Sequence, residues 1–327
     1  MTTPYVGRLA PSPTARQHIG NLRTALVAWL DARAHGGRLI LRIEDLDPAR
    51  SRPEFENQII EDFRAMGLDW DEGPGATAGP AELRNTHSPY RQSERAHYYR
   101  KIVTALEARN LVYPCFCSRK EIETAAGAPA PGEDGPRYPG TCRHLPPADA
   151  SRRISGGESY AFRFRADDRL VTMTDIHTGA AAENVSTLRG DFIVFRKDGV
   201  ASYQLAVVAD DRAMGVTCVV RGADLLDSTA RQVLLYEALG WTPPGFLHVP
   251  LVTGLGGRKF AKRERDITLP ELLHHGWTVE KILGYLAHSL GLLDRPEPVT
   301  PAGLLPHYRR DRLSDAPWEV DPGALLR

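Results

Sequence analysis

The sequence predicts an α/β protein built on a parallel sheet, and two observations support this. Within the first 43 residues an apolar segment at Tyr5–Ala10, a helical pattern from His18 to His35 and an apolar segment at Leu39–Ile43 follow one another. Strand, helix and strand in this order form a βαβ unit, whose strands are parallel and whose crossover is right-handed. A second alternation of strands and helices begins after residue 190. The length of 327 residues suggests about two domains.

Helical periodicity defines the elements of the first half. Glycines at 36–37 end the first helix, and Gly67 ends a second one, whose apolar residues recur at helical spacing over 55–66. Ser93 is a suitable N-cap for a third helix, which we expect to run to about Asn110.

The middle of the chain, over roughly residues 110–190, is predicted to be an insert. It contains a strand-like segment at Tyr160–Phe164. It also contains a run of Ala, Gly and Pro at Ala125–Pro136, which we expect to be a mobile loop because this composition cannot pack.

The second α/β stretch follows the insert. Strands are expected at Phe192–Phe195 and Ala201–Val208, on either side of a Lys-Asp-Gly turn, and at Val216–Val220. Helices are expected at Thr229–Leu239 and around Ile282–Leu290, before a tail rich in Pro and Arg.

Composition excludes several classes of protein. Apolar residues make up 42% and charged residues 25% of the chain, which is average for a globular protein. No stretch approaches the roughly 18 uncharged apolar residues of a membrane span, and no apolar signal region opens the sequence, so we expect a cytoplasmic protein without a membrane partner. Because 41 Lys and Arg balance 41 Asp and Glu, any surface for nucleic acid must be local.

The segment RLAPSPTARQHIGN, from Arg8 to Asn21, leaves the first strand and enters the first helix. A helix N-terminus offers unpaired N–H groups and the positive end of the helix dipole, which suit a phosphate. Gly20 lets a ligand approach the backbone closely, and His18 can donate a hydrogen bond to phosphoryl oxygens. On His18 and Gly20 alone, a proline-rich turn with a surface histidine is the simpler interpretation.

The whole segment, however, resembles the first signature of the class I aminoacyl-tRNA synthetases, HIGH, and its flanks APSPT and GNLRTAL resemble the glutamyl branch. Asn21 stands where the motif has its second His, a position that varies in this branch. The resemblance implies a Rossmann-like parallel sheet, ATP binding at His18, Gly20 and Asn21, and a catalytic role for His18.

Three further segments match the same branch: RIEDLD at 42–47, SYQLAVVADD at 202–211 and VVRGADL at 219–225. Taken singly they are an acidic turn, a strand tyrosine and a surface arginine. The resemblance implies that a carboxylate holds the ammonium group of glutamate and that two arginines bind its carboxylates, which suits the chemistry of these groups. The residues implied for glutamate are Arg8, Leu9, Ala10, Pro11, Ser12, Glu44, Tyr203 and Arg221.

The segment GGRKFAKR at 256–263 has the place of the second class I signature, KMSKS. A glycine-rich approach favours a mobile loop whose lysines reach ATP phosphates. The resemblance implies ATP binding by Lys259 and Lys262, with Lys262 catalytic. Ala261 departs from the usual serine of the motif.

Cys115 and Cys117 form a Cys-x-Cys pair, and Cys142 follows beyond the loop. Three thiolates with one N or O donor make a closed tetrahedral zinc site, and free buried thiols are the alternative. His144 is the commoner kind of donor, whereas the short glutamyl-queuosine enzymes, which this pattern resembles, use a tyrosine, here Tyr138. We expect one structural zinc per chain, with Tyr138 favoured as the fourth ligand and His144 as the alternative.

The end of the sequence distinguishes members of the branch. Only 64 of the 327 residues follow Arg263, too few for the anticodon-binding domains of full glutamyl-tRNA synthetases. Ala223 also stands where those enzymes usually have Glu. Both features resemble truncated paralogues, which activate L-glutamate with ATP and Mg²⁺ and pass it to the queuosine base at the wobble position of tRNA(Asp). The resemblance implies a monomer that binds this anticodon stem-loop.

Two alternatives stay open: a minimal glutamyl-tRNA synthetase that charges a tRNA 3′ end, and a non-catalytic paralogue that binds RNA. We expect residues 1–110 to form the first half of the catalytic domain and 111–190 a zinc-bearing α+β insert. The second half of the catalytic domain is expected at 191–250, and the KMSKS-like loop with a short helical tail at 251–327.

Overall fold

The structure is a computed structural model that describes residues 4–126, 137–258 and 267–326, and the statements below concern these residues. The chain begins with β1 (Val6–Leu9), α1 (Ile19–Ala34) and β2 (Arg38–Leu41). β1 and β2 pair in parallel along their whole length, which confirms the βαβ unit.

β1 also lies beside β8 (Cys218–Gly222). The backbone N–H of Thr217 donates to Val6 O at 2.9 Å, and Arg8 Nη1 donates to Val220 O at 2.7 Å, so the two strands run in the same direction. β8 pairs in parallel with β9 (Gly245–Val249). The carboxyl ends of β1, β2, β8 and β9 therefore lie along one edge, where open α/β sheets bind ligands.

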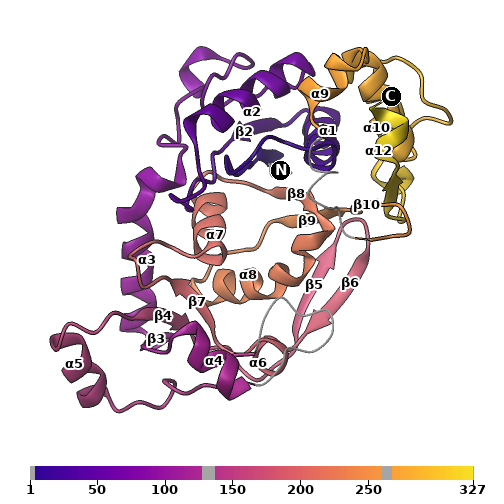
Figure 1. Ribbon diagram of the computed structural model, residues 1–327. Helices are drawn as coiled ribbons and strands as arrows, with labels where there is room; N and C mark the ends of the chain where they lie inside the picture. The colour runs from indigo at the N-terminus through magenta and orange to yellow at the C-terminus, as the bar shows by residue number, and fades with distance from the viewer. Residues whose placement is uncertain (1–3, 127–136, 259–266, 327) are drawn as a thin grey trace.

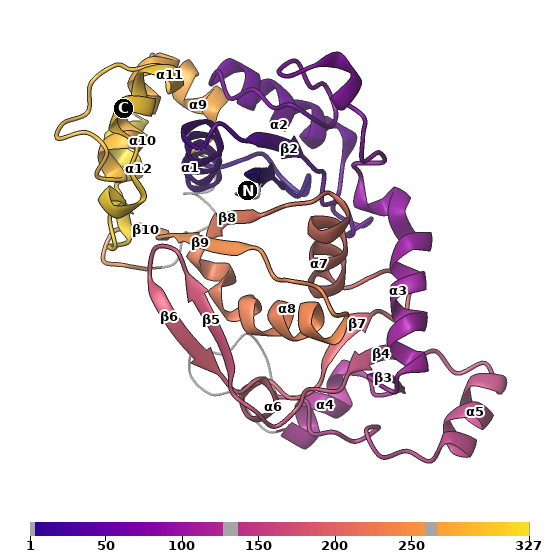
Figure 2. The ribbon, with the colours of Figure 1, turned by 180° about the vertical axis from the view of Figure 1, so that it is seen from behind.

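The far side of β9 carries a hairpin. β5 (Val171–Asp175) pairs in parallel with β9 at a single position, Asp175 opposite Phe246, and antiparallel with β6 (Gly179–Glu183). The hairpin is visible as the long arm beside β9 in Figures 1 and 2. Although it falls within the segment 111–190, it extends the sheet that contains β8 and β9.

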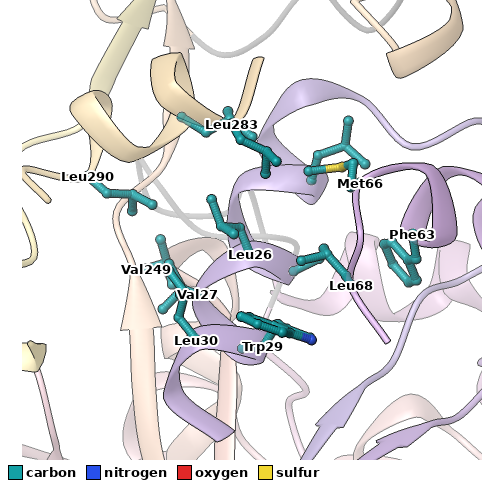
Figure 3. Packing of buried hydrophobic residues seen from close by; sticks show 14 of the residues in the cluster. Leu26, Val27, Trp29, Leu30, Phe63, Met66, Leu68, Val249, Leu283 and Leu290 are labelled. Atoms are coloured by element: carbon teal, nitrogen blue, oxygen red, sulfur yellow. The ribbon is translucent and has the colours of Figure 1, made fainter. Parts of the chain in front are cut away.

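Helix α1 is the centre of one hydrophobic core. Leu22, Leu26 and Leu30 are fully buried, and each such side chain contributes about 1.5–3 kcal/mol on burial. Figure 3 shows side chains of α1 meeting Phe63 of α2 (Pro53–Ala65), together with residues from β9 and from α10 (Val279–Ser289). This packing holds the start of α1 against the sheet edge.

Three groups of elements complete the fold (Figure 1). Helices α7 and α8 pack against each other, strands β3, β4 and β7 form an antiparallel sheet in that order, and the last helices lie together at the C-terminus. The bounds of these elements are α3 (Ala96–Ala108), β3 (Val112–Cys115), α4 (Arg119–Ala126), α5 (Pro147–Ser155), β4 (Ala161–Phe164), α6 (Val185–Leu188), β7 (Phe192–Phe195), α7 (Tyr203–Ala213), α8 (Leu226–Ala238), β10 (Val252–Gly254), α9 (Leu269–His274), α11 (Pro301–Leu304), β11 (Trp318–Val320) and α12 (Pro322–Leu325).

The C-terminal segment is tied to α1 by a buried carboxylate. Asp31, which is 0% exposed, accepts hydrogen bonds from Tyr5, Tyr308 and Arg310, the last through Nε at 2.7 Å and Nη2 at 2.8 Å. Because a buried charge is costly without a partner, this contact fixes the C-terminal segment on the βαβ unit.

Two expectations about local structure are wrong. Residues 201–208 form no strand beyond a single bridge from Ala201 to Phe195; the side chain of Ser202 instead accepts a hydrogen bond from the N–H of Leu205 and begins helix α7. Ser93 is not the N-cap of α3, because it lies in a 3-10 turn at Gln92–Arg95, its hydroxyl donates to Asp45 Oδ2 at 2.5 Å, and α3 starts only after Arg95.

The loop expected at 125–136 is in part helical, since α4 extends to residue 126; residues 127–136 lie outside the described part of the chain. No helix among the residues that the structure describes is long and apolar enough to cross a membrane.

Candidate active site and cysteine cluster

A cavity of about 950 Å³ lies at the carboxyl edge of β1, β2 and β8. It brings together segments that are more than two hundred residues apart in the sequence, from Arg8 to Gly257. The predicted glutamate and ATP residues that line it are Arg8, Leu9, Ala10, Pro11, Ser12, His18, Gly20, Asn21, Glu44, Tyr203 and Arg221. Lys259 and Lys262 lie outside the described residues.

The entry of α1 into this cavity is fixed by a reciprocal cap. His18 Nδ1 accepts a hydrogen bond from the backbone N–H of Gly20 at 3.1 Å, and Asn21 Oδ1 accepts one from the N–H of His18 at 3.2 Å. Asn21 therefore has a structural reason to stand where the motif has His, because its amide oxygen is the acceptor that completes the cap. The cap orients the imidazole at the helix N-terminus, where an anion is favoured.

Glu44 is held from behind by a buried arginine that the sequence reasoning did not single out. Arg42, fully buried, donates from Nη2 to Glu44 Oε1 at 2.9 Å and from Nη1 to Asp211 Oδ1 at 2.7 Å. Burial raises the pKa of Glu44, and the charges of Arg42 and Arg8 offset only part of that rise. One carboxylate oxygen is thus anchored by Arg42, and the side chain lines the cavity.

Arg8 is the second buried cation of this wall. Its Nη1 donates to Val220 O at 2.7 Å, and its Nε lies 3.7 Å from Asp211 Oδ1. Nε has no hydrogen-bond partner among the described residues. Arg8 thus lines the cavity with a guanidinium that is held on one side by the backbone of β8.

Arg221 and Tyr203 also line the cavity. Arg221 is 4% exposed and donates to Gln232, Thr229 and His248. Burial lowers the pKa of Arg221 and raises that of Tyr203, at the start of α7, and each group partly offsets the shift of the other. His248 had no signal in the sequence, since it lies in an apolar strand outside the matched motifs.

The three cysteines meet in the insert. Cys115 is the last residue of β3. The Sγ atoms of Cys115, Cys117 and Cys142 all lie within 4.8 Å of one another. The Sγ atoms of Cys117 and Cys142 are 3.5 Å apart, close to the roughly 3.8 Å expected between two thiolates on a tetrahedral zinc ion. The donor set therefore fits a structural zinc.

The hydroxyl of Tyr138 lies beside the cysteine cluster. Its hydroxyl lies 3.3 Å from Cys115 Sγ and 3.7 Å from Cys117 Sγ, and it accepts a hydrogen bond from the N–H of Cys142 at 2.9 Å. His144 is exposed and is not part of the group of metal-binding side chains. The arrangement favours Tyr138 over His144 as the fourth donor.

Buried Arg163 completes the surroundings of the cysteines. Its Nε donates to Cys115 Sγ at 3.3 Å, and its guanidinium lies 3.7 Å from the centre of the Tyr138 ring. A fixed positive charge at this place stabilises thiolates, the form in which cysteine binds metal.

Comparisons with known proteins agree with this architecture. Residues 5–288 match the family of class I tRNA synthetases (E and Q), catalytic domain. The chain is 48% identical over 315 residues to the glutamyl-Q tRNA(Asp) synthetase of Symbiobacterium thermophilum, an alignment that covers 96% of this chain and 95% of that protein. It is 47% identical over 287 residues to the protein of the same name from Nitratidesulfovibrio vulgaris, covering 88% and 86% of the two chains.

The fold is similar to that of a solved glutamate tRNA ligase. The crystal structure of the Elizabethkingia meningosepticum enzyme in complex with its amino acid superposes with a TM-score of 0.83 at 29% identity, covering 98% of this chain and 68% of that one. The family match spans most of the chain, and the matches to the shorter relatives span nearly their full length. The chain therefore belongs to the class I aminoacyl-tRNA synthetases of the glutamate and glutamine group, as a ligase of the glutamyl-Q tRNA(Asp) synthetase family.

Proposed function

We propose that this enzyme activates L-glutamate with ATP and transfers the glutamyl group to the queuosine base at the wobble position of tRNA(Asp). The observation that supports it most is that an anchored carboxylate, two buried arginines and a capped helix N-terminus line the same cavity. Relatives that align with this chain over nearly their full length carry the name glutamyl-Q tRNA(Asp) synthetase.

In the proposed pocket, Glu44 binds the ammonium group of glutamate, and Arg8 and Arg221 bind its carboxylates. A carboxylate and guanidinium groups are the partners that form charge-assisted hydrogen bonds with these groups. An amino acid with one ammonium and two carboxylates satisfies all three side chains at once.

In the activation step, an oxygen of the glutamate α-carboxylate attacks the α-phosphorus of ATP. A carboxyl–phosphate bond forms, the bond from the α-phosphorus to the bridging oxygen breaks, and pyrophosphate leaves with Mg²⁺. His18 and the N-terminus of α1 stabilise the charge on the α-phosphate, and Lys262 acts on the leaving phosphates. A hydroxyl of queuosine then attacks the carbonyl carbon of the adenylate, and AMP leaves.

We also propose one zinc ion per chain, held by Cys115, Cys117, Cys142 and Tyr138. The described cluster supports this donor set, because the thiols and the hydroxyl converge in a buried site. The ion would brace the insert and take no part in the chemistry.

The first test is ATP–pyrophosphate exchange with glutamate in the absence of RNA. We expect exchange with glutamate, and loss of it in Glu44→Gln, which keeps the shape of the side chain but removes the charge that binds the ammonium group. Absence of exchange in the unsubstituted protein would favour the non-catalytic RNA-binding paralogue.

The second test identifies the acceptor. Labelled glutamate is offered with tRNA(Asp) that contains or lacks queuosine, each intact or with its 3′ CCA end removed. Transfer to the trimmed, queuosine-containing tRNA alone would separate base modification from 3′ charging. Loss of acceptance on trimming, or efficient charging of tRNA(Glu), would favour the minimal glutamyl-tRNA synthetase instead.

A further inference from the structure

A buried chain of three side chains stands behind the wall of the cavity. Asp175 ends β5, His248 lies in β9 and Arg221 lies in β8, so three neighbouring strands each contribute one member. Arg221 lines the cavity, whereas Asp175 and His248 do not. The three residues are 5%, 1% and 4% exposed, so their side chains are almost completely buried.

The contacts are directional. Asp175 Oδ2 lies 2.7 Å from His248 Nδ1 and also accepts the backbone N–H of His248 at 3.0 Å. At the other edge of the ring, Arg221 Nε donates to His248 Nε2 at 2.9 Å. The other oxygen of Asp175 accepts the N–H groups of His177 and Thr178, at 2.9 and 2.8 Å.

Two constraints fix the same tautomer of His248. An arginine Nε–H can only donate, so His248 Nε2 must carry a lone pair. An ionised Asp175 can only accept, so His248 Nδ1 must carry the proton. The ring is therefore neutral, protonated at Nδ1, and serves as the acceptor that sets the orientation of the guanidinium.

The guanidinium is held at all three nitrogens. Besides the bond to His248, Nη1 donates to Gln232 Oε1 at 2.7 Å and Nη2 donates to Thr229 Oγ1 at 2.8 Å. These contacts use three of the five N–H groups of an arginine. The remaining two are left for Tyr203, which also lines the cavity, and for a ligand.

We propose that Asp175 and His248 are positioning residues, which hold Arg221 in the orientation that binds a carboxylate of the amino-acid substrate. This inference rests on the proposed function, since it takes Arg221 to contact glutamate. A side chain whose rotamer is fixed in advance loses little conformational entropy on binding. Loss of the contacts from Asp175 through His248 to Arg221 should therefore weaken glutamate binding and leave ATP binding unchanged.

The proposal also predicts a pH effect. The charged groups that face His248 are Asp175, Arg221 and Arg8, and burial together with the two arginines lowers the pKa of His248 below its usual 6.5 despite Asp175. Above that pKa the ring accepts from Arg221; once it is protonated, Nε2–H faces the Nε–H of the guanidinium. The KM for glutamate should therefore rise as the pH falls through the pKa of His248.

The test compares His248→Leu, which has no acceptor for Arg221, with His248→Gln, whose amide oxygen can replace Nε2. Pyrophosphate exchange is measured at a temperature at which thermal melts show each variant to be folded. We expect the leucine variant to raise the KM for glutamate about tenfold or more, with the KM for ATP within about twofold, and the glutamine variant to restore most of the loss. A merely structural role would lower kcat or stability without this selective change in KM.

A second measurement does not depend on the variants. ¹⁵N NMR of histidine-labelled, unsubstituted protein at neutral pH should show His248 protonated at Nδ1 and not at Nε2. The opposite tautomer, or an unchanged KM for glutamate in His248→Leu, would overturn the proposal. If the unsubstituted protein shows no exchange with glutamate, it is the proposed function that fails, and that outcome is seen before any variant is made.

Discussion

Replacement of Tyr138 by Phe is the sharpest test of the cysteine cluster, because it removes a single oxygen from a site otherwise made of sulfur. In the unsubstituted structure Tyr138 is 4% exposed, and its hydroxyl lies against the Sγ atoms of Cys115 and Cys117. Its loss removes the proposed fourth ligand and also leaves the buried N–H of Cys142 without its acceptor. The unsatisfied N–H alone costs about 1–3 kcal/mol.

The loss of zinc affinity should be larger than this local cost suggests. Removal of a group that merely orients a metal ligand lowers affinity about 10- to 100-fold, so removal of the ligand itself should exceed that range. Cys117→Ala should lose the metal altogether. His144→Ala, by contrast, changes an exposed side chain outside the cluster and should keep one zinc per chain, with stability within about 0.5 kcal/mol.

The assay is metal analysis of protein prepared without chelator, followed by competition with a zinc-binding dye. Tyr160→Phe is the matched control, since Tyr160 is a partly buried tyrosine of the same insert that packs on Phe116 and is not part of the cluster. Retention of zinc by Tyr138→Phe together with its loss in His144→Ala would refute the assignment. Protein that contains no zinc at all would refute the site.

Three further outcomes follow from buried charges. Arg8→Met should raise the KM for glutamate about 30-fold or more in pyrophosphate exchange, since an unpaired buried carboxylate costs about 2–5 kcal/mol; an unchanged KM would remove Arg8 from the pocket. Arg310→Ala should lower the free energy of unfolding by about 3 kcal/mol, because Asp31 is buried, whereas Arg295→Ala, whose ion pair is exposed, should cost under about 1 kcal/mol. Burial raises the pKa of Asp175, but hydrogen bonds from His248, Thr178 and His177 lower it by more, so that it lies at about 2, below its usual 3.8. The ionised carboxylate should therefore contribute roughly 2 kcal/mol to the free energy of unfolding above pH 3.8, and acid melts should show this contribution lost as the pH falls through 2.

The parts of the fold that the sequence predicted well are those decided by local pattern. The βαβ unit and the ends of α1 follow from apolar spacing, from His18 and from the glycines at 36–37, all within one short segment. Arg8, Glu44 and Arg221 line one cavity because they lie in or just after β1, β2 and β8, and parallel strands present their carboxyl ends at one edge.

The errors arose where tertiary burial overrides local pattern. The segment 201–208 is apolar and follows a Gly-containing turn, as a hairpin strand would, yet it is a helix buried on all sides, with Asp210 and Asp211 at its end. Those aspartates are buried because Arg95 and Arg42 reach them from elsewhere in the chain. Long-range ion pairs of this kind leave no trace in spacing, and the same holds for His248, whose partners lie on two other strands.

Buried ionisable side chains form two sets behind the cavity. In one set Arg42 donates to both Asp211 and Glu44; in the other, Asp175 contacts the neutral ring of His248, which accepts a hydrogen bond from Arg221. Arg42 and Glu44 are thus paired before any ligand arrives, whereas the side chains that accept hydrogen bonds from Arg221, which are His248, Gln232 and Thr229, are neutral. In the proposed function, the ammonium group of the ligand pairs with Glu44, and a carboxylate supplies the negative charge that Arg221 lacks among its protein partners. We therefore expect the site to select by charge pattern, because neutralising either end of the ligand leaves Glu44 or Arg221 unpaired.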